Sequence, residues 1–224
     1  MNPQLTSLLA ASTAFVGTHF IMSHPLRAGM VRALGEKGFL GLYTLVSLGT
    51  FAWMVVAFRA SPAGTGEVSE GAWVAASVLT IVALVLFLGS LLGNPALPDT
   101  PKEKVATAKA HGVFLVTRHP MMWGFALWAL AHILLGWSER TLILAGSLLI
   151  LALVGAHLQD RKKEALLGDA WAHWEAQTSY WPRWQRLGAA GPVVWIASLV
   201  IWAAATWAHK WLAGIPAGVW LWLG

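Results

Sequence analysis

The chain has 224 residues, of which 57% are apolar and only 11% are charged, whereas a soluble domain carries about 25% charged residues. It contains no cysteine, which excludes disulfides, thiolate metal sites, iron–sulfur clusters, cysteine nucleophiles and haem attached through a Cys-x-x-Cys-His motif. Nucleic acid binding is not expected, because the basic residues lie in short connections between apolar segments. Composition therefore predicts an integral membrane protein, and the 15 tryptophans agree, since amphipathic rings favour the membrane interface.

Six apolar stretches follow one another along the chain. A helix needs about 20 residues to cross the hydrocarbon core of a bilayer, and each stretch has or approaches that length. The stretches run over residues 4–23, 38–58, 71–93, 120–137, 141–158 and 191–208. No segment shows the alternation of a strand. The expected fold class is all-α, a polytopic integral membrane helical bundle of about six spans that forms a single membrane domain over residues 1–224.

The basic residues predict the orientation in the membrane. Most of the 15 Lys and Arg residues lie in the alternate connections 24–37, 94–119 and 159–190. Because cytoplasmic connections carry an excess of positive charge, these three are expected in the cytoplasm and both termini on the other side of a bacterial inner membrane. This partition requires an even number of spans. The first stretch has no positive residue before it and is expected to stay as an anchor.

Two of the cytoplasmic segments have helical character of their own. Residues 102–116 predict a short helix that leads into the fourth span. Residues 160–184 predict an amphipathic helix, either an anchor at the membrane interface or a lid over a site. The last stretch, residues 211–224, is short and broken by Pro216, so we expect an interfacial or re-entrant piece.

Histidines are the candidate functional residues inside the spans. His19 lies in the first stretch and His132 in the fourth, while no Asp, Glu, Lys or Arg lies deep in any stretch. That pattern argues against an ion-driven transporter and against hydrolysis by paired carboxylates. Two imidazoles without further ligands make a poor zinc site but a suitable axial pair for haem, which brings its own four equatorial nitrogens. The alternative is that each histidine only bonds a neighbouring helix.

A second group of candidates lies at the cytoplasmic side. His24 and His119 each precede a proline, and proline is common at the first position of a helix. A helix N-terminus can hold an anion, so Arg118 and His119 could face a haem propionate, as could Arg27. The alternative for both arginines is contact with lipid phosphate. Gly124 either allows close packing of two helices or makes room for a cofactor.

Three segments resemble the NnrU family of membrane proteins. They are residues 19–27 (HFIMSHPLR), 41–48 (GLYTLVSL) and 117–136 (TRHPMMWGFALWALAHILLG). The family is similar to plant 15-cis-zeta-carotene isomerase, a haem b enzyme of plastids. More distantly, the Arg-His-Pro motif is similar to that of isoprenylcysteine carboxyl methyltransferases.

The resemblance implies haem b held by two helix-borne histidines that would also be the catalytic residues. They match His19 and His132 here, with His119 or His24 as the alternative to one of them. At 1.5 Å per residue, His19 lies about 12 Å from Arg27 and His132 about 21 Å from Arg118, so the two imidazoles differ in depth by about 9 Å. The isomerase is associated with a cysteine ligand near the second histidine, and this chain has none.

Three functions are compatible with these features. The first is a haem-dependent cis–trans isomerase of a polyene, which would take an apolar substrate from the bilayer. The second is a haem-containing accessory or sensor protein in nitrite and nitric oxide metabolism. The third is a membrane methyltransferase, in which residues 118–120 and 164–184 would bind S-adenosylmethionine.

Overall fold

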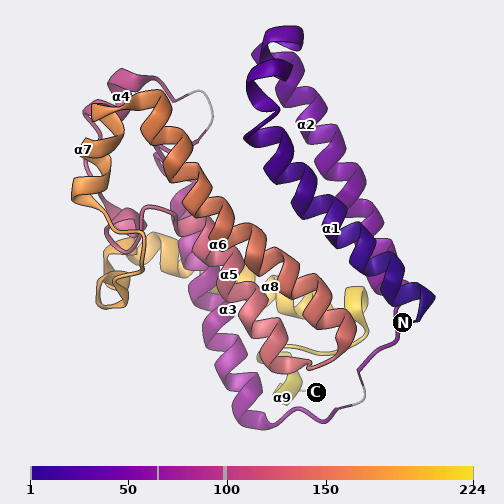
Figure 1. Cartoon of the computed structure of the whole chain (residues 1–224). Coiled ribbons are helices and arrows are strands. Elements are labelled where there is room, and N and C mark those ends of the chain that lie inside the picture. Colours follow the sequence, from indigo (N-terminus) through magenta and orange to yellow (C-terminus); the bar gives the residue numbers. More distant parts are fainter. Residues whose placement is uncertain (1, 65, 98–99, 224) are drawn as a thin grey trace. The chain divides into compact units, whose positions relative to one another are not determined.

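The computed structural model describes residues 2–64, 66–97 and 100–223, and every regular element in these ranges is helical. The predicted all-α class is therefore confirmed. The elements, drawn in Figure 1, are α1 (Pro3–Ser23), α2 (Arg27–Ala60), α3 (Glu70–Ser90), α4 (Lys102–Ala106), the 3₁₀ helix η1 (Gly112–Leu115), α5 (Pro120–Leu135), α6 (Glu139–Leu167), α7 (Asp169–Gln177), the 3₁₀ helix η2 (Trp184–Ala190), α8 (Pro192–Ala213) and α9 (Trp220–Leu223).

Within the described ranges, five helices are long and apolar enough to cross a membrane, namely α1, α2, α3, α6 and α8. The chain is accordingly a multi-pass membrane protein. The fourth predicted stretch forms α5, which has 16 residues and rises about 24 Å, less than the roughly 30 Å of a hydrocarbon core. Five of the six predicted stretches therefore correspond to helices of spanning length, and the fourth corresponds to the shorter α5.

Two glycines change the predicted boundaries. Helix α2 begins at Arg27 and bends at Gly35, whose φ of 72° suits a residue without a side chain, so most of the predicted connection 24–37 is helical. Helix α6 runs to Leu167, and Gly168, with φ 54°, separates it from α7. The expected single amphipathic helix over 160–184 is thus wrong. The expected helix over 102–116 consists of two short elements, α4 and η1.

Contacts divide the chain into two compact units, and the first comprises Met1–Glu67 and Gly136–Leu151. Helices α1 and α2 pack against each other there. Leu8, Phe15 and Met54 are buried at the centre of this unit, and Leu148 of α6 packs against them. Many large apolar side chains of these helices face outward, Leu45 among them at 69% exposed, as suits contact with lipid.

The second unit comprises Val68–Leu135 and Ala152–Gly224, and in it α3 packs against α5 and α8. At Gly124, helices α3 and α5 approach each other closely. A Cβ atom at that position would lie 2.8 Å from the carbonyl oxygen of Ala83 and 3.4 Å from atoms of Phe87. Helices in lipid associate largely through such close packing. The structure therefore places Gly124 against α3, which is the packing use predicted for it.

Substituting Gly124 tests this packing. Gly124→Ala should destabilise the protein by about 1–3 kcal/mol, because α3 or α5 must shift to admit the methyl group. The matched control is Gly146→Ala in α6, where no atom lies within 4 Å of the added Cβ and the better helix propensity of alanine should be neutral or stabilising. Thermal unfolding of both variants in detergent measures the difference. Equal melting temperatures would contradict the packing role.

Candidate functional site

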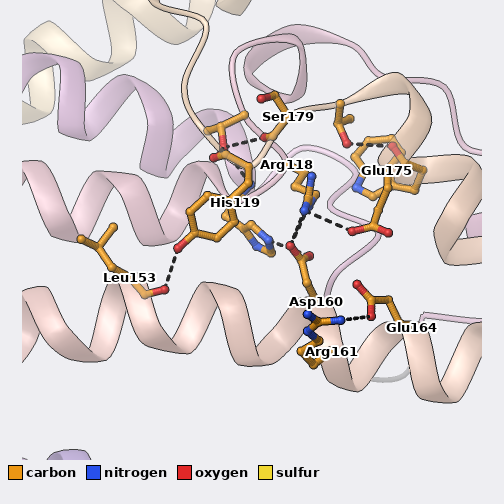
Figure 2. Close-up of polar contacts among 12 residues, drawn as sticks. Arg118, His119, Leu153, Asp160, Arg161, Glu164, Glu175 and Ser179 are labelled. Carbon is orange, nitrogen blue, oxygen red and sulfur yellow. Dashed lines mark hydrogen bonds and ion pairs between the residues drawn. The ribbon is translucent and has the colours of Figure 1, made fainter.

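A cluster of charged side chains is buried in the second unit (Figure 2). Arg118 and His119 come from the segment just before α5, Asp160 from α6 and Glu175 from α7. The side chains of His119 and Asp160 are only 1% and 5% exposed, and that of Arg118 is 14% exposed. Ionised groups so far from water require close partners.

Asp160 is the centre of the cluster, because each of its two oxygens accepts hydrogen bonds. Arg118 donates to Oδ2 from Nε at 2.8 Å and from Nη2 at 2.5 Å, while His119 Nε2 donates to Oδ1 at 2.8 Å. The same Arg118 Nη2 lies 3.1 Å from Glu175 Oε1. One guanidinium thus bridges two carboxylates that belong to different helices.

Backbone contacts hold these residues in place. The amide of Arg118 donates to the carbonyl of Ser179 at 2.8 Å, and the amide of Arg183 donates to the carbonyl of Val116, also at 2.8 Å. The Thr117 hydroxyl lies 2.8 Å from the Tyr180 carbonyl oxygen. The segment before α5 is therefore bonded to the irregular segment after α7. This pairing satisfies backbone groups that neither segment could satisfy in a helix of its own.

His119 is held through one ring nitrogen only. Its Nε2 donates to Oδ1 of Asp160, and its Nδ1 lies just before the start of α5. Nδ1 is buried and, within the part of the chain that the structure describes, has no hydrogen-bond partner.

Burial affects the acidic groups near Arg118. It raises the pKa of Glu175 above its usual range, and the charges of Asp160 and Glu164 act in the same direction. The charge of Arg118 opposes this rise without reversing it, because burial is the larger effect. Burial likewise raises the pKa of Tyr180, whose ring lies under Arg118 at 5.8 Å from the guanidinium carbon.

A cavity of about 610 Å³ opens beside the cluster. Its walls come from the cluster, from the second half of α6 and from the segment after α7. The lining residues are Arg118, Leu153, Val154, His157, Asp160, Arg161, Glu164, Tyr180 and Trp181. Tyr180 is fixed in the wall by its hydroxyl, which donates to the carbonyl of Leu153 at 2.8 Å. Arg118 and the segment 164–184, grouped by the methyltransferase hypothesis, thus contribute to one cavity.

The two histidines predicted as haem ligands, His19 and His132, do not line this cavity. His132 is on α5, about 20 Å from His119 along the helix axis. Its Nδ1 donates to the carbonyl of Trp128 at 2.8 Å. His19 is on α1 in the first unit, where its Nδ1 donates to the carbonyl of Phe15 at 2.7 Å. Its Nε2 lies 3.4 Å from the Ser47 hydroxyl. The two share one local arrangement, a ring held by the carbonyl four residues earlier.

The remaining candidates, His24 and Arg27, also lie in the first unit. Nδ1 of His24 is 2.8 Å from the Ser23 hydroxyl. Arg27 forms an ion pair with Glu36 at 3.1 Å and lies over the ring of Phe39. Its charge, like that of Arg118, is therefore already matched by a carboxylate of the chain.

Sequence reasoning missed Asp160, Glu175 and Tyr180. A signal for Asp160 was present, since the chain has only 10 acidic residues and this one directly follows an apolar stretch and precedes three bases. Arg118, next to a helix start, required a counterion. The sequence alone did not indicate which acid would supply it.

The family model for the NnrU protein matches residues 7–217. The chain belongs to the NnrU family. The predicted resemblance is confirmed, and it extends beyond the three segments to the buried cluster, α7 and α8. Comparisons with curated proteins and with solved structures give no match. Among the described residues of this NnrU protein, no group of three or more His, Asp or Glu side chains is arranged to hold a metal ion.

The cluster should be essential for stability. Asp160→Asn leaves the nearly buried guanidinium of Arg118 with a weaker partner, and we expect it to lower the free energy of unfolding by about 3 kcal/mol. The control is Glu164→Gln, which breaks an exposed ion pair with Arg161 at 3.3 Å and should cost less than about 1 kcal/mol. Thermal or denaturant unfolding in detergent measures both, and similar losses would show that the cluster is no more than a surface network.

Proposed function

We propose that this NnrU protein binds haem b with His19 and His132 as the axial ligands. One observation carries the proposal: in both side chains, Nδ1 donates to the backbone carbonyl four residues earlier, at 2.7 and 2.8 Å. This bond places the proton on Nδ1 and leaves the lone pair on Nε2. Histidines that bind metals are usually oriented by such a bond from the other ring nitrogen.

The surroundings of each ring support the fit. Nε2 of His19 has only a long contact of 3.4 Å with the Ser47 hydroxyl, which a stronger ligand bond would replace. The ring of His132 lies against Trp128 with the centroids 3.9 Å apart, so its orientation is restricted. Haem brings its own four equatorial nitrogens, so one or two imidazoles from the chain are enough to hold it.

The alternative ligands fit less well. His119 already uses Nε2 in its bond to the carboxylate of Asp160, and its Nδ1 is buried. Freeing Nε2 would leave the Asp160 oxygen without this donor in a site nearly closed to water, which is costly. Nδ1 of His24 lies near the Ser23 hydroxyl and the Phe20 carbonyl, beyond the end of α1.

We further propose that the protein catalyses cis–trans isomerisation of an apolar polyene that enters from the bilayer. Bound haem would supply a redox-active iron, and the resemblance to the carotene isomerase supports that use. The chain's own contribution would be to orient two imidazoles and to keep water away with apolar helices. A ligand exchange through cysteine cannot operate in this chain, which has none.

We also propose the location and orientation given by the basic residues. The protein would lie in a bacterial inner membrane with both termini outside the cytoplasm, an arrangement that requires the shorter apolar helix α5 to cross as a sixth span. The connections 24–37, 94–119 and 159–190 would then face the cytoplasm. Arg161 and Trp181 are 67% and 68% exposed. Exposed basic and aromatic side chains suit the boundary between the membrane and the cytoplasm.

Single substitutions test the ligands. His19→Ala and His132→Ala should each remove most of the haem absorbance, because a lost axial ligand weakens binding of the group and shifts its Soret band. The measurement is the oxidised and reduced absorption spectrum of protein purified after expression with added haem precursor. The control is His157→Ala, an exposed histidine on α6, which should bind haem like the unaltered protein.

Full haem content with an unshifted Soret band in both variants would refute this pair of ligands. Loss of haem in His119→Ala alone would instead assign a ligand from the buried cluster. Loss in all variants with a matching drop in melting temperature would identify unfolding, so each sample needs a melting curve beside its spectrum.

A further inference from the structure

The cavity beside Arg118 has an apolar end and a charged end. Leu153 and Val154 lie in the apolar part of α6, whereas Arg161 and Glu164 lie near its end. At 1.5 Å per residue, Leu153 and Glu164 are about 16 Å apart along the helix. A cavity that changes from apolar to charged over this length matches an amphiphilic molecule.

The Arg, Asp and Glu side chains that line the cavity carry equal numbers of positive and negative charges. Arg118 and Asp160 are engaged with each other inside the cluster (Figure 2). The remaining pair, Arg161 and Glu164, lies at the rim with side chains 67% and 40% exposed and 3.3 Å apart. An exposed pair of this kind contributes little stability, so a ligand can replace it at small cost. Opposite charges side by side favour a ligand that carries both signs over one with two negative groups.

Aromatic side chains complete the wall. Trp181 is 68% exposed, and its ring packs against Tyr180 and Trp123 at centroid distances of 5.5 Å. Exposed tryptophan beside an apolar helix is typical of the membrane interface, where lipid headgroups begin. The cavity therefore lies where a lipid could reach it without leaving the bilayer.

We propose that this cavity binds one zwitterionic phospholipid. Its phosphate would pair with Arg161 and its ammonium group with Glu164, while the upper part of an acyl chain would lie along Leu153, Val154 and Trp181. All of these residues belong to the second unit, and the proposal does not depend on haem. The haem proposal gives this cavity no role, and lipid binding would supply one.

The test uses detergent-purified full-length protein and native mass spectrometry. Phosphatidylethanolamine should bind as one molecule per chain, about tenfold tighter than phosphatidylglycerol, which lacks the ammonium group. Arg161→Gln and Glu164→Gln should each weaken phosphatidylethanolamine binding about tenfold, the effect expected from one lost charge-assisted hydrogen bond. Glu36→Gln is the matched control, because it breaks another exposed ion pair, with Arg27 at 3.1 Å, and should leave binding of the single lipid in this cavity unchanged.

Four results would overturn the proposal. Equal binding of both lipids, unaffected by the variants, would show annular lipid only. A loss with Arg161→Gln but not with Glu164→Gln would show an anion site. Tight binding of soluble glycerophosphoethanolamine would show a ligand from the aqueous phase, and displacement of the lipid by S-adenosylmethionine would show a methyl donor site. The Soret band of the two rim variants should stay unchanged, which separates this result from the haem proposal.

Discussion

The ion pair between Arg118 and Asp160 is the interaction on which the second unit depends. Removing two charges from water costs several kcal/mol each, and the cost is offset only where geometry and additional hydrogen bonds are favourable. Here both oxygens of Asp160 accept bonds, and Arg118 reaches Glu175 as well. Because the partners come from three different segments, the pair defines how the chain enters α5 and leaves α7. The adjacent cavity exists only because those two irregular segments have fixed paths.

The spanning helices follow a different physical rule. Apolar surface gains little by leaving lipid for another helix, so close packing must hold the helices together. Gly124 serves this purpose, since it brings α5 into contact with the backbone of α3. The orientation of α5 in turn determines where His132 lies and where Arg118 and His119, just before the helix, meet Asp160. Packing in the apolar region and ionic contacts outside it therefore depend on the same helix.

Sequence reasoning worked where the local pattern carries the information. Hydropathy placed α1, α3 and α8 within a few residues of their observed ends, because a long apolar stretch is sufficient for a spanning helix. It underestimated α2 and α6, since a helix can continue into polar sequence until a residue such as Gly168 stops it. The Arg-His-Pro motif identified one side of the cluster. Asp160 lies 42 residues away from Arg118, and only the tertiary fold determines such a pairing.

Three histidines, His19, His119 and His132, differ in the groups that they contact, and this difference underlies the proposals. His119 donates from Nε2 to the carboxylate of Asp160, so this nitrogen is already bonded within the protein. His19 and His132 donate through Nδ1 to backbone carbonyls, so Nε2 is the ring nitrogen that remains for another partner. A soft or borderline metal requires the second kind of imidazole. The buried cluster holds segments and forms a cavity, and His19 and His132 are the residues that we propose as ligands of haem iron. Because the two sites share no residue, evidence against one proposal leaves the other intact.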